Sequence, residues 1–235
     1  MEFEKISTVS VQENVTQVLL KKILSGEIKP GEKLPSEREL ASLMGVSRGT
    51  LHQAILDLAS KGFLEILPRH GTVVNDYREK QTPQSLSVVM SYGSDSLSRP
   101  LFLDLMATRR LLEVECARLS CSNIYPTTLE KMKEIVEELA TEQDIRLASD
   151  LIFRFHYTLV KASGNSIYSM VYRGFESILQ TLIQKHYALR PGDLQETITL
   201  NRALVESIEK KDEEKAMLLT RELLDLGVDT LKEKY

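Results

Sequence analysis

The spacing of apolar and polar residues divides the chain into two unlike parts. Up to about Asn75, short apolar-periodic segments alternate with turn residues, such as Pro30-Gly31 and Gly45. The first segment, Gln12–Ser25, predicts a helix whose core-facing residues are Val15, Val18, Leu19 and Ile23. From Leu101 onward glycine is rare, and apolar residues recur at helical spacing to the end of the chain. The pattern therefore predicts a small mixed region followed by a larger helical one.

Two short helices are predicted between Ser36 and Leu58. Ser36 with Glu39 three residues later forms a capping-box pattern at the start of the first, and Gly45 can adopt the left-handed conformation that ends it. Ser47 is the expected cap of the second. The apolar positions of the first are Leu40, Leu43 and Met44, and those of the second are Leu51, Ala54, Ile55 and Leu58. Two helices at this spacing, with a polar face at the start of the second, are typical of a helix-turn-helix.

A β-hairpin is predicted to follow the second helix. Phe63–Leu67 and Thr72–Val74 are rich in strand-forming residues, and Pro68–Gly71 between them is a turn. A hairpin at this place would be the wing of a winged helix-turn-helix.

The second part predicts an antiparallel bundle of six amphipathic helices with short connections. In the first of these helices, the residues expected to face the core are Leu101, Leu105, Thr108, Leu112 and Leu119. Ile167–Leu189 is predicted as one long helix with Ile167 and Met170 facing inward. The fold class expected is mainly α. The expected domains are a winged helix-turn-helix over 1–76, a linker and connecting segment over 77–97, and a helical effector-binding and dimerisation domain over 98–235.

The N-terminal part resembles the GntR family of bacterial transcription regulators. The match runs from about Val15 to Asn75, on Gly26, Pro30-Gly31, Leu34-Pro35, Glu37-Arg38-Glu39-Leu40-Ala41, Gly45-Val46-Ser47-Arg48, Leu58 and Gly62. The resemblance implies that DNA is contacted by Arg38 and by the start of the second helix, at Ser47, Arg48, Gly49 and Thr50, with His70 and Gly71 at the wing tip. His52 is also a candidate, although the family usually carries arginine there. An arginine can bond guanine O6 and N7 with two donors, and a neutral histidine cannot, so a different operator or a weaker contact is expected.

The C-terminal part resembles the effector-binding domain of the FadR-like subfamily of these regulators. The resemblance rests on Arg109-Arg110-Leu111-Leu112-Glu113, Phe155-His156, Ala162-Ser163-Gly164-Asn165, Asp212 and Ala216. Many members hold a divalent metal with one aspartate and three histidines, and a small carboxylate effector binds beside it. Here only His156 is present, because Ile152, Asn201 and Leu223 stand at the other expected positions. One imidazole without partners is a poor metal site, so no metal and no cofactor are expected.

The effector-binding candidates are Arg109, Arg110, His156, Asn165 and Asn201. A guanidinium matches a carboxylate or phosphate, so Arg109 or Arg110 would take the acid group of the effector. Two alternatives remain open: a surface ion pair with Glu113, and a core role for His156. His186, near a helix end, is expected at the surface or rim. Some metal-free relatives respond to acyl-coenzyme A, which gives a second effector class for this chain as a regulator of lipid metabolism.

Composition narrows the function classes. Of 235 residues, 42% are hydrophobic and 27% charged, which suits a globular protein. The net charge of −4 is not that of a general nucleic-acid binder, so Lys and Arg would have to gather on one surface. A run of about 18 apolar residues is missing, and the N-terminus lacks a signal-peptide pattern, so a cytoplasmic protein is expected. Cys116 and Cys121 are too far apart on one helix to bridge and are expected to be reduced.

Three function classes follow, and the first is favoured. It is a DNA-binding regulator, a homodimer on an inverted-repeat operator, which responds to a small acidic effector and has no membrane partner. An enzyme built on the bundle is disfavoured because the sequence has no Gly-rich phosphate loop, nucleophile elbow or paired histidine–carboxylate site. A protein-binding adaptor is the third. The sequence does not distinguish an activator from a repressor.

Overall fold

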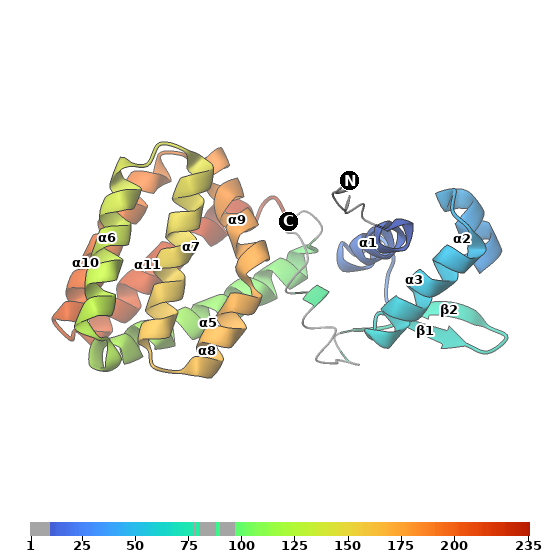
Figure 1. The fold of residues 1–235 in the computed structure, drawn as a ribbon, viewed down its shortest axis with the longest axis horizontal. Coiled ribbons are helices and arrows are strands. Elements are labelled where there is room, and N and C mark those ends of the chain that lie inside the picture. The colour runs from blue at the N-terminus through green and yellow to red at the C-terminus, as the bar shows by residue number, and fades with distance from the viewer. Residues whose placement is uncertain (1–9, 78, 80–87, 90–96) are drawn as a thin grey trace, which may run out of the picture. The chain divides into compact units, whose positions relative to one another are not determined.

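The computed structural model describes residues 10–77, 79, 88–89 and 97–235. The chain divides into two compact units, Met1–Val89 and Met90–Tyr235, and both are mainly helical (Figure 1). The expected fold class is confirmed. The predicted connecting segment 77–97 falls almost entirely outside the described residues.

The N-terminal unit contains α1 (Val11–Leu24), α2 (Glu37–Met44) and α3 (Arg48–Ser60). Local signals define these helices. Ser10 and Glu13 form a full capping box at α1, and Ser36 accepts the Glu39 N–H at α2. Gly45 ends α2 with φ +64°, in the left-handed region that glycine adopts without strain. α1 and α2 both pack on α3, which buries Leu51, Ala54, Ile55 and Leu58.

The predicted wing is an antiparallel hairpin of β1 (Leu64–Leu67) and β2 (Gly71–Val74), labelled in Figure 1. Leu64 pairs with Val74 and Leu67 with Gly71. The three residues between the strands are exposed, and Arg69 among them has a left-handed backbone with φ 65°. The hairpin therefore presents an exposed tip, as expected of a wing.

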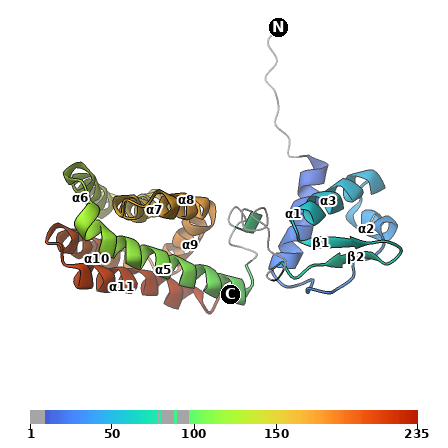
Figure 2. The same ribbon diagram turned by 90° about the horizontal axis from the view of Figure 1, so that it is seen from below.

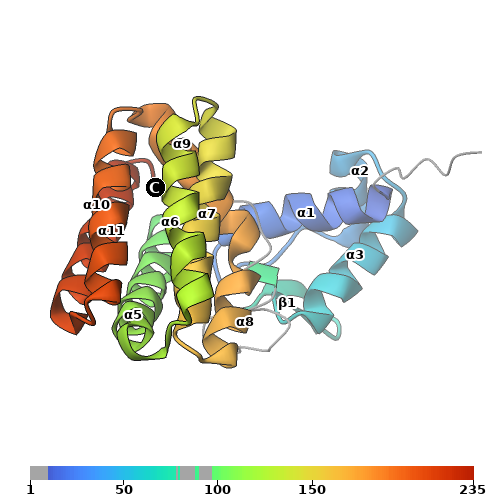
Figure 3. The same ribbon diagram turned by 60° about the vertical axis from the view of Figure 1, so that its left-hand side comes forward.

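The C-terminal unit is a bundle of seven helices among the described residues. They are α5 (Arg99–Asn123), α6 (Pro126–Thr141), α7 (Ile145–Ala162), α8 (Ser166–Gly174), α9 (Glu176–Leu189), α10 (Asp193–Glu209) and α11 (Glu213–Leu231). α7 packs against α5, α6 and α9, and α11 packs against α5, α9 and α10 (Figure 2). The C-terminal pair, α10 and α11, lies side by side in Figure 3. A shared apolar core fills the space between these helices.

The predicted helix Ile167–Leu189 is wrong, because the structure divides it into α8 and α9 at Phe175. Ile167 and Met170 were expected inside, but they are 61% and 67% exposed. Because Phe175 interrupts the helix, a single helical pattern does not describe both pieces. Gly174, the last residue of α8, weakens a helix at this point and was the available signal.

Several predicted core positions are also exposed: Val18, Leu43 and Thr108. Among the described helices α1 packs mainly on α3, so only part of its apolar surface is covered. α5, by contrast, contacts α7, α10 and α11, and its buried face is wide and centred on Phe102, Met106, Glu113 and Cys116. Among the residues described, no helix combines the length and apolar character needed to cross a bilayer.

Candidate nucleic-acid interface and interior cavity

The first turn of α3 is exposed and held by a side-chain cap. The Ser47 hydroxyl accepts the Thr50 N–H at 3.1 Å and lies 2.8 Å from the Thr50 hydroxyl. Arg48 and Gly49 in this turn are exposed, and the Arg48 side chain is 75% exposed. The buried residues of α3 begin at Leu51, so the exposed residues before it can meet a partner.

Glu37 of α2 lies between two candidate contact residues of α3. Its Oε1 is 2.9 Å from His52 Nδ1, and its Oε2 is 3.6 Å from Arg48 Nε. The structure therefore brings Arg48 and His52 together on one carboxylate, a partner that the sequence analysis did not identify.

The remaining candidates for DNA contact are exposed. Arg38 is exposed on α2, and His70 and Gly71 are exposed at the end of the hairpin. Gly71 has φ +92°, in the left-handed region, so this position favours glycine.

A cluster of buried polar side chains lies inside the bundle. Arg109 and Glu113 of α5 form an ion pair at 2.5 Å, and His156 Nδ1 of α7 is 2.6 Å from the other Glu113 oxygen. Burial alone would raise the pKa of Glu113, but Arg109 and His156 together lower it to about 2. The buried Tyr172 has a pKa raised well above its ordinary value, by burial first and then by the Glu113 charge. Glu113 is therefore a buried anion held by two partners.

A small cavity adjoins this cluster. Its volume is about 40 Å³, and Arg109, His156, His186, Tyr187 and Thr197 supply its polar lining. The apolar lining comes from Met106, Ile152, Leu182, Ile183, Leu223, Leu224 and Leu231. Burial lowers the pKa of His186, which favours the neutral imidazole. The cavity lining thus combines the Arg109 guanidinium, several other polar groups and a mainly apolar wall.

Three predicted effector-binding residues lie outside this lining. Arg110 is half-exposed and pairs with Asp225 of α11. Asn201 is fully buried on α10, and its side-chain atoms are without hydrogen-bond partners in the described part of the chain. Asn165 caps α8 by accepting the N–H groups of Ile167 and Tyr168. The structure therefore brings Arg109 and His156 together and leaves Arg110 and Asn165 apart from them.

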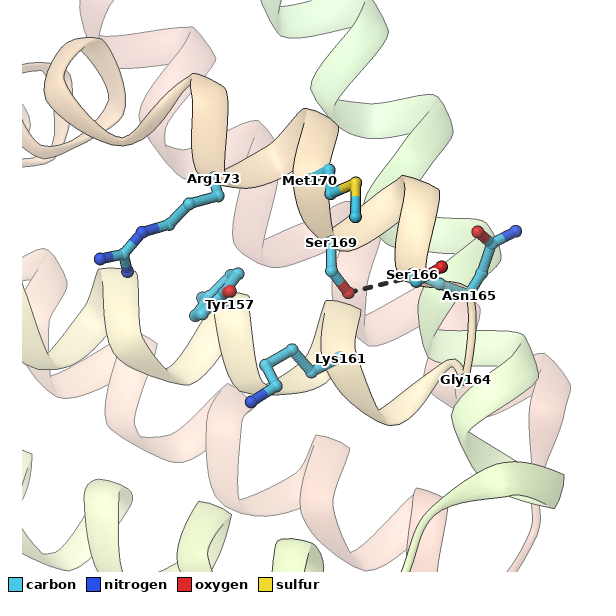
Figure 4. A pocket seen from close by; sticks show the side chains of 8 residues that line it. All are labelled: Tyr157, Lys161, Gly164, Asn165, Ser166, Ser169, Met170 and Arg173. Carbon is cyan, nitrogen blue, oxygen red and sulfur yellow. Dashed lines mark hydrogen bonds between the residues drawn. The ribbon is translucent and has the colours of Figure 1, made fainter.

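Asn165 borders a separate open groove between α7 and α8 (Figure 4). The Lys161 and Arg173 side chains flank the Tyr157 ring (Figure 4), with Nζ 5.9 Å and Cζ 5.2 Å from its centroid. This groove and the interior cavity share none of their lining residues.

Two family models match the chain. The description "Bacterial regulatory proteins, gntR family" matches residues 11–74, and "FCD domain" matches residues 104–226. Together they cover both units, and the second alone covers more than half of the chain.

The chain belongs to the GntR family of bacterial transcription regulators.

Known relatives of this GntR protein are regulators. It is 28% identical to the HTH-type transcriptional regulator Mce2R of Mycobacterium tuberculosis, over 98% of this chain and 95% of the relative. It is 31% identical to the fatty acid metabolism regulator protein of Edwardsiella ictaluri, over 74% and 71%. A solved structure described as Lar, which controls expression of the Listeria monocytogenes agr system, covers 97% of this chain and 99% of its own, with TM-score 0.62 and 20% identity. That structure supports the fold, while the domains and relatives define a transcription regulator rather than an enzyme.

The residues of this GntR protein do not fit the divalent metal found in many such domains. The four expected positions hold Ile152, His156, Asn201 and Leu223, and two of these have no ligand atom. Instead, His156 Nδ1 lies 2.6 Å from Glu113 Oε2. Among the described residues, no group of three His, Cys, Asp or Glu side chains is placed to hold a metal.

The structure buries several polar residues that were expected at the surface or were not expected to take part. Arg109 pairs with Glu113, as one alternative had it, but inside the bundle and not at the surface. His186 was expected at the surface, and this is wrong, because it is buried where α9 packs against α7 and α11, with Asp193 of α10 at 3.5 Å from its Nε2. Tyr172 and Glu37 were not identified at all. A polar residue within an apolar helical face was the available signal for His186, while Glu37 carried none.

Proposed function

We propose that this GntR regulator binds an inverted-repeat operator as a homodimer. The exposed first turn of α3, with Arg48 and His52, supports a role in reading base edges, and the exposed hairpin tip supports a role for His70 in the adjacent groove. One winged helix reads too few base pairs to be specific within a genome, and a two-fold dimer doubles the site. Arg38 and the start of α3 would hold the phosphates.

Sedimentation and DNA footprinting test this proposal. We expect a dimer at micromolar concentration and a protected site with two-fold symmetry. A monomer that binds a half-site with full specificity would contradict it. Affinity should fall as salt rises, because phosphate contacts release counterions. Binding that is indifferent to salt would favour a protein-binding adaptor instead.

We infer that the regulator belongs to the FadR-like subfamily and takes a small acidic effector in the interior cavity without a metal. The observation that carries this proposal is the Arg109 guanidinium in the lining of a mainly apolar cavity. A guanidinium there can bind a carboxylate, and Ile152 and Leu223 would contact an apolar part of the same ligand. The expected effector is therefore an organic acid with a hydrophobic chain.

The cavity is too small for such a ligand in this conformation. Its volume of about 40 Å³ is near that of one water molecule, whereas ligand sites usually exceed about 300 Å³. Binding must therefore move the helices or side chains that close it. A ligand shifts the equilibrium between two protein conformations only if it binds them with different affinities. The effector would stabilise an expanded bundle, and we propose that the protein in this expanded state releases DNA.

Thermal shifts with monocarboxylic acids of increasing chain length test the effector. Arg109→Lys keeps the charge but loses the guanidinium fork, so it should lose the shift. Arg110→Lys is the matched control, because Arg110 is at the surface and paired with Asp225. A response to short polar acids alone, or an equal response in both variants, would refute this pocket.

Acyl-coenzyme A is the second candidate effector. The apolar lining and the similarity to fatty acid metabolism regulators favour it. A thermal shift with acyl-coenzyme A and none with free acids would select this candidate over the first.

A further inference from the structure

The contact between Glu37 and His52 fixes how the imidazole is presented. Glu37 Oε1 lies 2.9 Å from His52 Nδ1. A carboxylate only accepts hydrogen bonds, so Nδ1 must carry the hydrogen and donate it. In the neutral ring the other nitrogen, Nε2, is then an acceptor.

His52 stands where a base-reading side chain is expected. It is the fifth residue of α3, one turn after Arg48, and its side chain is 45% exposed. The buried residues Leu51, Ala54, Ile55 and Leu58 form a stripe beside it on the helix. In a helix-turn-helix, the first residues of the second helix contact base edges in the major groove.

We propose that Glu37 positions His52 so that its neutral imidazole accepts one hydrogen bond, through Nε2, from a base amine. In the major groove, the amines of cytosine and adenine are the donors, whereas guanine O6 and N7 and thymine O4 are acceptors. His52 would therefore select cytosine or adenine at one operator position. Glu37 is the positioning residue and does not itself touch the base. The inference rests on the proposed operator binding.

The same carboxylate also restrains Arg48. Arg48 Nε lies 3.6 Å from Glu37 Oε2, and the Arg48 side chain is 75% exposed, so the terminal nitrogens of its guanidinium can still bond a partner. These nitrogens can bond guanine O6 and N7 together. Arg48, which donates two hydrogen bonds, and His52, which accepts one, would thus lie one helical turn apart. We therefore expect the operator to contain guanine and, close to it, cytosine or adenine.

Selection from random DNA tests this inference with four proteins. The wild type should enrich cytosine or adenine at one position in each half-site, by about 3- to 10-fold for one hydrogen bond. His52→Ala should lose that preference and keep the others. In Glu37→Gln the amide can accept from Nδ1–H or donate to Nδ1, so the ring hydrogen is also allowed on Nε2, and guanine or thymine should become accepted at that position as well.

Glu39→Gln is the matched control. It removes the same charge from an exposed residue of α2. Any general gain in DNA affinity from the lost negative charge should therefore appear in both variants. The change of base preference should appear only in Glu37→Gln. Melting temperatures of all four proteins identify a folding defect.

Two outcomes would overturn the inference. In the first, the wild type selects guanine or thymine at the position where His52→Ala loses its base preference. This would mean that the imidazole donates its hydrogen bond to the base. The other is an unchanged selected site in both His52→Ala and Glu37→Gln, which would leave Glu37 as a tie between α2 and α3. If the wild type selects no sequence at all, the proposed operator binding fails instead.

Discussion

Glu113 is the residue whose replacement tests the interior of the bundle most directly. Its carboxylate is fully buried between Arg109 and His156, and Glu113→Gln keeps the shape while removing the charge. The Arg109 guanidinium stays charged in this variant, because arginine does not lose its proton in proteins, so a buried cation is left without its partner. Removing one partner of a buried ion pair costs about 3–5 kcal/mol. A unit of this size melts about 2–4 °C lower per kcal/mol, so a decrease of roughly 6–20 °C is expected.

The pH dependence gives a second estimate of the same quantity. The pKa of Glu113 is lowered from 4.5 to about 2 on folding, which corresponds to about 3 kcal/mol. For a lowered carboxyl pKa, this stability is fully present above pH 4.5 and is lost as the pH falls through 2. The wild type should therefore lose its advantage over Glu113→Gln between these two values.

Urea unfolding followed by tyrosine fluorescence measures the free energy of unfolding and so tests this prediction. Seven of the eight tyrosines follow Met90, and the chain has no tryptophan, so the signal reports mainly the bundle. Glu115→Gln is the control two residues along α5. Its pair with Arg118 is at the surface and should contribute less than about 1 kcal/mol. If Glu113→Gln is within 1 kcal/mol of the wild type above pH 5, the buried charge network does not stabilise the bundle as argued.

Further predictions concern DNA and metal. Arg48→Ala should weaken specific binding by about 1–3 kcal/mol without changing the melting temperature; a variant that melts early and binds normally would give Arg48 a structural role. Arg38→Ala should weaken binding to specific and random DNA alike, as a phosphate contact does, which competition titrations measure. His52→Arg should move the selected operator toward guanine at the facing position, and an unchanged site would mean that His52 is not a reader. Elemental analysis of protein purified without chelator should find substoichiometric metal; near-stoichiometric zinc, nickel or manganese whose removal by EDTA destabilises the protein would refute the metal-free site.

Short-range signals in the sequence predicted much of the fold. Ser47 caps α3 and Gly45 ends α2 because the atoms involved lie within a few residues of each other. The hairpin followed for the same reason, from two strand-forming segments and a turn between them. The family resemblance then placed the exposed candidates for DNA contact, which remain predictions at the level of single residues.

The errors arise where packing between distant segments decides. His186 is buried because α9 packs against α7 and α11, which a local reading of a helix end does not reveal. Similarly, Ile167 and Met170 have the spacing of core residues, but α8 leaves their side of the helix uncovered. The contact of Glu37 with His52 spans 15 residues and depends on how α2 lies on α3, so it could not be read from spacing.

The two cysteines of this bundle can report how often its helices open. Cys116 and Cys121 are both buried on α5, and burial raises the pKa of each thiol to about 11. At neutral pH almost none of either thiol is the reactive thiolate, and the surrounding helices keep reagents away. Labelling therefore requires the bundle to open around α5. The rate at which a thiol reagent modifies the unaltered protein thus measures how often that opening occurs, and the same measurement with and without a ligand reports which state the ligand favours.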